Sequence, residues 1–452
     1  MHAPCTHGFR SRRTPIAAAY HPGVGWIGIA GTGARMSTTV TAPAQSAVAA
    51  KPLAWRWLVA GVLSCVVIVG FFDRISVAVL FTNADFGAAM GTGFNPVLMG
   101  TLMTAFLLPY AFSALFLSFT GDVFSPRRLL MAVASTWGAL MLAMGAATSY
   151  GFMFACRFLL GVAEGPQFSW IQKILRRWFP PHEYGRASSI WSLGSPLGAA
   201  IGFPLLIYLV ATFGWRSAFY IVGLLNLLIV VPLLWTVVRD WPHNVSEQTV
   251  KKDKRSFGEV LRDSRIFLTD WRFWALAVSD CGALMYLWGL SSWLPTYLQR
   301  ERHFDLQHLG IYSSLPFILS VCGQVLTGIV IDRTDRAGWL CFVGCFMAGV
   351  FIYLGANASE ATTAAILIAC SGGCFGMWAI AVYVLMRKVI PESAFAAGAG
   401  TINGIANAAG STAPVIVGFV ISLTGSFSSG LLVIVIAPIL GSLPLLALMR
   451  RY

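Results

Sequence analysis

Charged residues are scarce in this chain of 452 residues. Asp, Glu, Lys and Arg make up 11% of it, whereas 57% is hydrophobic and the mean hydropathy is +0.72. A soluble domain carries roughly 25% charged residues. The shortage of charge excludes an ordinary soluble protein and predicts a protein that crosses a membrane several times.

Motifs for catalysis and metal binding are also missing. The sequence has no G-x-x-x-x-G-K-[ST] phosphate loop and no nucleophile motif, which argues against an enzyme and an ATP-driven pump. The absence of a soluble domain also argues against a receptor. The nine cysteines are scattered without the spacing of a metal site. We expect free buried thiols, no cofactor, no metal and no enzymatic activity.

The net charge of +13 does not indicate a nucleic-acid partner. The basic residues fall in short loops between apolar runs, as the topology of a membrane protein requires. We therefore expect this chain to lie in the lipid bilayer and not to bind nucleic acid.

Twelve apolar segments come near the ~20 residues that a spanning helix needs. One long polar connection separates them into two sets of six. We expect an all-α membrane protein with twelve transmembrane helices in two six-helix halves, placed roughly at residues 57–82, 97–119, 129–148, 150–174, 187–212, 217–238, 273–298, 309–331, 339–357, 362–386, 397–421 and 428–449.

The expected domains follow from this division. They are a disordered tail at 1–52, an N-terminal half at 53–240, a linker at 241–271 and a C-terminal half at 272–452. The tail has no sustained apolar run, which is typical of disorder. Met36 begins a Ser/Thr/Ala-rich stretch typical of a short tail, and we expect it as an alternative start of translation.

The distribution of basic residues predicts orientation. The loops at 83–96, 149, 358–361 and 422–427 contain no Lys or Arg, whereas basic residues flank most of the alternate connections. Excess positive charge marks the cytoplasmic side. We expect a multi-pass protein of the cell inner membrane, monomeric, with both termini in the cytoplasm.

Five positions inside the apolar segments carry ionisable side chains. A charge in the bilayer costs at least about 2.5–3.5 kcal/mol, so such residues usually face a polar interior and handle ions or substrate. Two of them are arginines, which indicates an anionic substrate. The five are Asp73, Arg74, Arg157, Glu164 and Asp280.

The two halves share a local pattern of an acid followed by arginines. Asp122 precedes Arg127 and Arg128 after the second segment, and Asp332-Arg333 precedes Arg336 after the eighth. Matching positions indicate duplication, as in transporters built from two parallel halves. We expect these residues to form gating loops.

Several motifs in this order resemble the major facilitator superfamily and, more narrowly, its anion:cation symporter family. The run from Phe71 to Ala78, containing Asp73-Arg74, is similar to the first-helix signature, and the run from Arg157 to Pro166 to the fourth-helix motif. Asn403, Asn407, Gly410 and Pro414 fit the eleventh helix. The resemblance implies a proton-coupled carrier of sugar acids or other organic acids.

The chain departs from the family pattern at a few positions. Ser118 and Ser125 stand where the second-to-third loop usually has glycines, and Pro126 is unusual there. Ser195 aligns with a polar amide that some sugar-acid carriers place in helix five. The serines and Pro126 affect what the resemblance implies for the loop geometry. Ser195 affects what it implies for the identity of the substrate.

The two arginines are expected to bind the anion. Helical rise puts Arg74 and Arg157 at similar depths, roughly 10–12 Å below the outer ends of their segments. Their planar guanidinium groups can hold one or two carboxylates by paired hydrogen bonds. A structural pairing with a nearby acid is the alternative for each.

The acids are expected to carry protons. Glu164 is seven residues from Arg157, too far for a tight pair along one helix. Burial disfavours the charge of a carboxylate without a close cation, so Glu164 could take up and release a proton; a structural tie between helices is the alternative. Asp73, about 100° around the helix from Arg74, is the second candidate. Asp280 is a third, with substrate contact or packing as alternatives.

Four further residues complete the expected substrate site. The resemblance implies Tyr110 and Trp378, for which packing is the alternative. Asn403 and Asn407 share one helix face, where amides are costly unless paired, so they either bind substrate hydroxyls or join helices.

The sequence thus predicts proton-coupled import of a small organic anion, namely a sugar acid, a dicarboxylate or an aromatic carboxylate. The alternative is a proton-coupled exporter of drugs or organic cations. The glycines and prolines between Gly194 and Pro204 are compatible with the exporter, whereas two cavity arginines argue against it.

Overall fold

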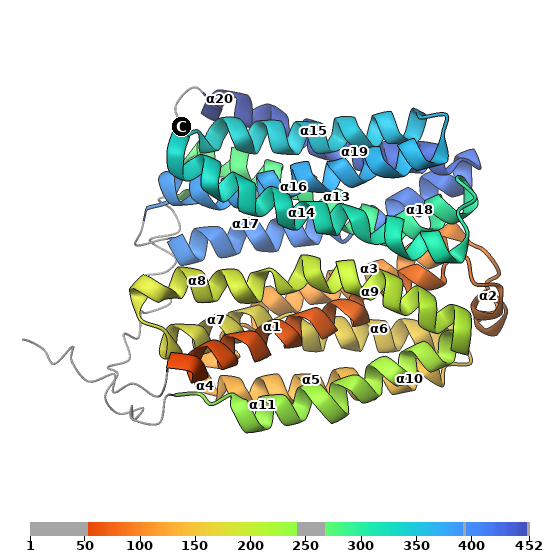
Figure 1. The fold of residues 1–452 in the computed structure, drawn as a ribbon, viewed down its shortest axis with the longest axis horizontal. Coiled ribbons are helices and arrows are strands. Elements are labelled where there is room, and N and C mark those ends of the chain that lie inside the picture. The colour runs from red at the N-terminus through yellow and green to blue at the C-terminus, as the bar shows by residue number, and fades with distance from the viewer. Residues whose placement is uncertain (1–52, 242–266, 392–394, 450–452) are drawn as a thin grey trace, which may run out of the picture. The chain divides into compact units, whose positions relative to one another are not determined.

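The structure, a computed structural model, describes residues 53–241, 267–391 and 395–449, which form helices and no strand (Figure 1). The tail expected at 1–52 and most of the linker expected at 241–271 lie outside the described residues. The described residues belong to one folded unit, residues 49–452.

The N-terminal half begins with a long apolar helix and continues through short connections. Its elements are α1 (Leu53–Ile75), η1 (Ala78–Leu80), α2 (Ala84–Met90), α3 (Pro96–Leu117), α4 (Thr120–Val123), α5 (Pro126–Gly145), α6 (Tyr150–Glu164), α7 (Gln167–Trp178), α8 (Pro181–Ser192), α9 (Gly194–Phe213), α10 (Trp215–Leu225), η2 (Asn226–Val230) and α11 (Val231–Val237).

The C-terminal half has longer uninterrupted helices. Its elements are α13 (Trp271–Arg300), α14 (Leu306–Thr334), α15 (Ala337–Asn357), α16 (Ala361–Val389), α17 (Phe395–Gly410), α18 (Ala413–Thr424), α19 (Phe427–Ser442), η5 (Leu443–Leu445) and α20 (Leu446–Met449).

Eleven helical stretches in the described residues are long and apolar enough to cross a membrane. Each overlaps a span expected from hydropathy, which confirms the all-α membrane fold. The remaining expected span, 150–174, is covered by α6 and α7, which Gly165 and Pro166 separate. Proline has no backbone N–H to continue a helix, which explains the break. The two pieces have 15 and 12 residues, fewer than the ~20 that a spanning helix needs.

Short polar residues start many of these helices. Asn95 accepts a hydrogen bond from the Leu98 N–H (3.1 Å) at the start of α3, and Ser149 accepts one from the Phe152 N–H (3.3 Å) at the start of α6. Such caps satisfy backbone donors that the helix leaves unpaired. They fix the helix starts at the loops.

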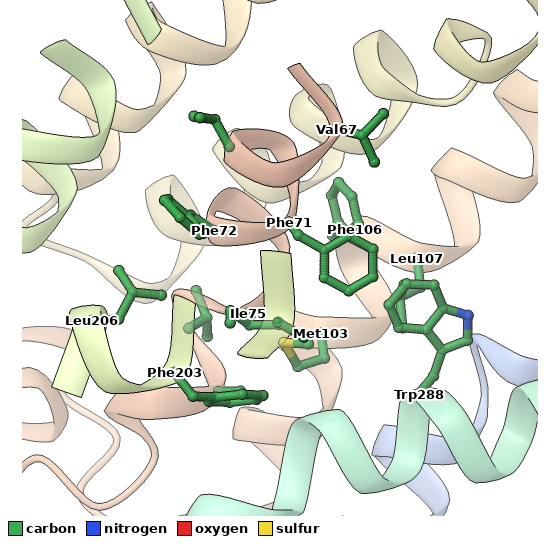
Figure 2. Close-up of a cluster of buried hydrophobic side chains, with 14 of the residues drawn as sticks. Val67, Phe71, Phe72, Ile75, Met103, Phe106, Leu107, Phe203, Leu206 and Trp288 are labelled. Carbon is green, nitrogen blue, oxygen red and sulfur yellow. The ribbon is translucent and has the colours of Figure 1, made fainter. Parts of the chain in front are cut away.

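Small residues let α9 lie directly against α1. A Cβ atom at Gly198 would approach the Ile68 carbonyl oxygen to 2.8 Å, and one at Gly202 would approach the Phe72 ring to 2.8 Å. These two glycines therefore allow close packing of the two helices. Figure 2 shows Phe72 and Ile75 of α1 packed near Phe203 and Leu206 of α9, which holds the helix that carries Asp73 and Arg74.

The two halves meet closely at the end of the helices opposite the start of α1. Thr82 donates a hydrogen bond to Gln299, and the Phe81 and Trp293 rings lie 5.0 Å apart. The Arg300 guanidinium lies 3.9 Å from the centre of the Phe94 ring. Contacts between α9 and α14 and between α3 and α18 join the halves along their length. We call the end where Thr82, Phe81 and Phe94 contact the C-terminal half the sealed end.

Candidate functional site

A cavity of about 320 Å³ lies between the two halves. From the N-terminal half it is lined by the rings of Phe71, Tyr110, Phe168 and Trp191, together with Arg74. Arg74 is the one charged residue among the lining residues of the described chain.

The C-terminal half contributes five further rings and several amides and hydroxyls to the lining. The rings belong to Tyr286, Trp288, Phe317, Phe375 and Tyr383. Trp191 near the end of α8, Tyr383 near the end of α16 and Asn403 in α17 extend the lining away from the sealed end. The arrangement can enclose a small molecule whose charge meets Arg74 and whose body meets aromatic rings.

Arg74 is held in a box of aromatic rings and an acid. Its Nε and Nη2 atoms both lie 2.6 Å from Glu164 Oε1. The guanidinium carbon lies 5.0 Å from the Phe71 ring, 4.9 Å from Tyr110 and 5.2 Å from Phe168. The three rings lie close around the guanidinium, and an anion would bind it through its N–H donors.

Glu164 is fully buried at the end of α6. Its Oε1 also accepts a hydrogen bond from Gln167 Nε2 at 2.9 Å, while Oε2 has no hydrogen-bond partner among the described residues. The expectation that Glu164 lacks a close cation is therefore wrong, because Arg74 reaches it from α1. The unpaired Oε2 is an oxygen on which a proton can sit.

Asp73 faces a different neighbour from Arg74, as expected. Its two carboxylate oxygens each lie 3.3 Å from Asn226 Nδ2. Asn226 opens η2, a five-residue π-helical segment, which presents the amide toward α1. Such segments often occur at functional sites. Asp73 is buried and does not line the cavity.

Arg157 lies beside Arg74, as the similar depths predict, but it does not line the cavity. It donates to the backbone carbonyls of Asp73 (2.9 Å) and Arg74 (3.2 Å), where α1 ends and its carbonyls lack helical partners. The structure thus places its donors on the backbone, away from the site where we expected an anion. Arg157 holds the helix end from which Asp73 and Arg74 project.

The other residues expected at the site, four for substrate and Asp280 for a proton, divide into two groups. Tyr110, Asn403 and Asn407 line the cavity, and Asn407 Nδ2 donates to the side-chain oxygen of Asn403 at 3.0 Å. Trp378 and Asp280 are buried in the C-terminal half away from the lining. Trp378 Nε1 donates to Ser279 Oγ at 3.0 Å, so this indole packs on α13 in place of facing the cavity.

The residues expected in gating loops lie at helix ends. Arg127 and Arg128 begin α5, where the Arg127 N–H donates to Asp240 at 3.0 Å. Asp122 lies in α4. Asp332 and Arg333 end α14, and Arg336 precedes α15; all three are exposed. The nearby ion pair joins Lys388 to Asp335 at 2.6 Å.

Several contacts at the site were missed from sequence. Gln167 and Asn226 hold the two acids, and Trp288 lies next to Phe71 in the cluster of buried side chains (Figure 2). A lone amide in an apolar segment is costly unless paired, so Asn226 carried a signal that it has a buried partner. No group of three His, Cys, Asp or Glu in the described chain could hold a metal ion.

Replacing Arg157 with Lys is expected to lower stability more than affinity. An ammonium cannot reproduce the planar fork that serves two carbonyls, and a buried unpaired polar group costs about 1–3 kcal/mol. The melting temperature of the purified protein should fall, while folded Arg157→Lys should retain more anion affinity than Arg74→Lys. Unchanged melting together with an affinity loss equal to that of Arg74→Lys would show that Arg157 contacts the anion.

Adding a methyl group at Gly418 is expected to open the sealed end. A Cβ there would meet the Pro96 carbonyl oxygen of the other half. Such overpacking costs about 1–3 kcal/mol, which shifts a two-state population roughly five- to hundredfold. A cysteine placed at Thr82 should then react faster with an impermeant maleimide in Gly418→Ala. Gly61→Ala, where a Cβ meets nothing within 4 Å, is the control. Equal labelling rates in the unmodified protein, Gly418→Ala and Gly61→Ala would show that the contact at Gly418 does not keep this end closed.

Comparisons with known proteins agree with this fold. The chain resembles a protein named a probable sulfoacetate transporter of Cupriavidus necator, with 29% identity over 82% of this chain and 89% of the relative. A probable L-galactonate transporter of Escherichia coli is 24% identical over 85% of this chain and 87% of the relative. A quinolone resistance transporter of Acinetobacter baumannii is 26% identical over 83% and 89%.

A solved structure supports the same architecture. A bacterial homologue of the human lysosomal transporter Spinster, in an inward-facing and unoccupied conformation, superposes with a TM-score of 0.71. It is 19% identical and covers 88% of this chain and 95% of that chain, so it supports the fold alone. Residues 62–418, most of the sequence, match the Major Facilitator Superfamily. The chain is therefore a transport protein and belongs to the Major Facilitator Superfamily.

Proposed function

We propose that this transporter imports a small organic anion (a sugar acid, a dicarboxylate or an aromatic carboxylate) together with protons. The observation that carries the proposal is the Arg74–Glu164 pair at the cavity wall. The relatives named for sulfoacetate and L-galactonate are transporters of organic anions, which supports an anionic substrate.

The pair supplies a means of coupling. In the empty carrier the charges of Arg74 and Glu164 balance. An incoming carboxylate competes with Glu164 for the guanidinium, and a buried carboxylate without its cation is strongly disfavoured. Glu164 is then neutralised by a proton, which leaves Arg74 to the anion. Binding of the anion and binding of the proton therefore favour each other.

Asp73 and Asp280 are further candidates for proton sites. Asp73 is buried with the Asn226 amide against its carboxylate, and Asp280 is buried in the other half. More than one proton would help import, because a negative interior opposes anion entry by ~2.3 kcal/mol per charge per 100 mV. The carried protons must at least offset the anion's charge.

Alternating access is the proposed transport cycle. The protein is a monomer in the cell inner membrane with both termini in the cytoplasm, so the cavity extends toward the cytoplasm and the sealed end faces outward. The contacts at Thr82, Phe81 and Phe94 then close the outer side. The acid-and-arginine loops at the cytoplasmic ends of the helices are the proposed gates for the opposite state.

Transport by purified protein in liposomes tests the proposal. An acidic exterior should drive accumulation of a carboxylate inside, and an uncoupler that collapses the pH gradient should abolish it. Movement of organic cations alone would overturn the proposal.

The exporter of drugs or organic cations is a second candidate. Aromatic rings dominate the cavity, and such rings also bind organic cations. One relative is named a quinolone resistance transporter. Arg74 argues against a cationic substrate because its positive charge lies in the cavity lining and would repel a cation.

A further inference from the structure

We propose that the cavity selects aromatic monocarboxylates over sugar acids and dicarboxylates. This inference rests on the proposed function, because it narrows the class of anion bound at Arg74. Three features of the lining carry it: the number of cations, the state of the polar groups and the placement of the rings.

The lining offers one cation. Arg157 donates to the backbone carbonyls of Asp73 and Arg74 and does not line the cavity. No Lys or His, and no arginine besides Arg74, lines the cavity within the described chain. A second carboxylate would therefore be desolvated against rings without a counter-charge, which is strongly unfavourable. A monoanion matches this site.

Three polar side chains of the lining donate hydrogen bonds within their own helices. Asn407 donates to Asn403 (3.0 Å), Ser192 Oγ to the Ser189 carbonyl (3.2 Å), and Gln324 Nε2 to Ser320 Oγ (3.4 Å). A sugar acid carries several hydroxyls, each needing a partner once buried. These three bonds would have to be broken before the same donors could serve the hydroxyls of a sugar acid.

The rings next to Arg74 are placed to receive a flat apolar body. Phe71 and Trp288, one from each half, face each other with 6.3 Å between ring centres and 16° between planes (Figure 2). The Phe71 ring is also 5.0 Å from the Arg74 guanidinium. A carboxylate on the edge of Arg74 would bring an attached aromatic ring against this pair, where stacking adds to the burial of apolar area.

Binding to the purified full chain tests the inference. The probes are benzoate, cyclohexanecarboxylate, glucuronate, succinate and tetraphenylphosphonium, measured by competition and by tryptophan fluorescence. Benzoate should bind most tightly, with about a two- to tenfold advantage over cyclohexanecarboxylate, which shares its size and charge but cannot stack. Tighter binding of glucuronate or succinate would overturn the substrate class and leave anion import standing. Binding of tetraphenylphosphonium alone would overturn both proposals.

A matched pair of variants isolates the ring contribution. Trp288→Leu should remove most of the preference for benzoate over cyclohexanecarboxylate, and Trp288→Phe should restore part of it. Trp339→Leu, which changes an exposed tryptophan outside the cavity, should leave that preference unchanged. An unaltered preference in folded Trp288→Leu contradicts the inference, and the wild-type ranking decides it if that variant does not fold.

Discussion

Anion affinity is expected to fall roughly ten- to hundredfold when Arg74 is replaced by Lys. A hydrogen bond to a charged group contributes about 1.5–3 kcal/mol, and an ammonium cannot present the planar fork of N–H donors at the cavity edge. The ring box around the guanidinium, formed by Phe71, Tyr110 and Phe168, is also shaped for a flat cation. Isothermal titration of the purified variant with a transported carboxylate measures the loss.

A second arginine provides the control for this experiment. Arg216 donates to the backbone carbonyls of Gly145 and Ala147, at 3.1 and 2.8 Å, and does not line the cavity. Arg216→Lys should therefore bind the anion like the unmodified protein. If Arg74→Lys also bound like the unmodified protein, Arg74 would not be the anion site.

Replacing Glu164 with Gln is expected to abolish uphill uptake while exchange continues. Glutamine matches the neutral, protonated acid in shape but cannot release a proton. Arg74 then keeps its charge for the anion without competition, so binding should persist and lose its pH dependence. Uptake driven by a pH gradient and counterflow exchange should be measured on the same liposomes.

The control for Glu164→Gln is an acid outside the site. Glu360 is exposed, with Oε2 accepting a hydrogen bond from Thr363 at 2.8 Å. Glu360→Gln should keep both activities. Full gradient-driven accumulation in Glu164→Gln would remove this residue from proton coupling and leave Asp73 or Asp280 as the candidates.

Hydropathy was sufficient to predict the helices of this protein. In a membrane the backbone must satisfy its own hydrogen bonds, so long apolar runs become helices whatever their tertiary contacts. The loops therefore fall within a few residues of the expected positions. The fourth span is an exception, because Gly165 and Pro166 divide it into α6 and α7. The short helix α2 is another, since it lies in a stretch expected to be a loop.

The partners of the site residues were harder to predict. Spacing relates Arg157 to Glu164, which share a helix, but the ion pair that forms joins Arg74 to Glu164 across 90 positions of the sequence. Which face of α1 meets α6 depends on helix rotation and packing, including the glycines of α9 that seat α1. For the same reason, the sequence does not predict that Arg157 donates to the carbonyls at the end of α1 or that Trp378 donates to Ser279.

Proton uptake on anion binding tests the central claim most directly. Purified protein in weakly buffered detergent solution is mixed with a transported carboxylate, and a pH indicator records protons taken from solution per anion bound. Competition for Arg74 predicts about one proton taken up per anion in the unmodified protein and almost none in Glu164→Gln. Anion binding without proton uptake, or equal uptake in the two proteins, would contradict the claim that Glu164 and the substrate compete for Arg74.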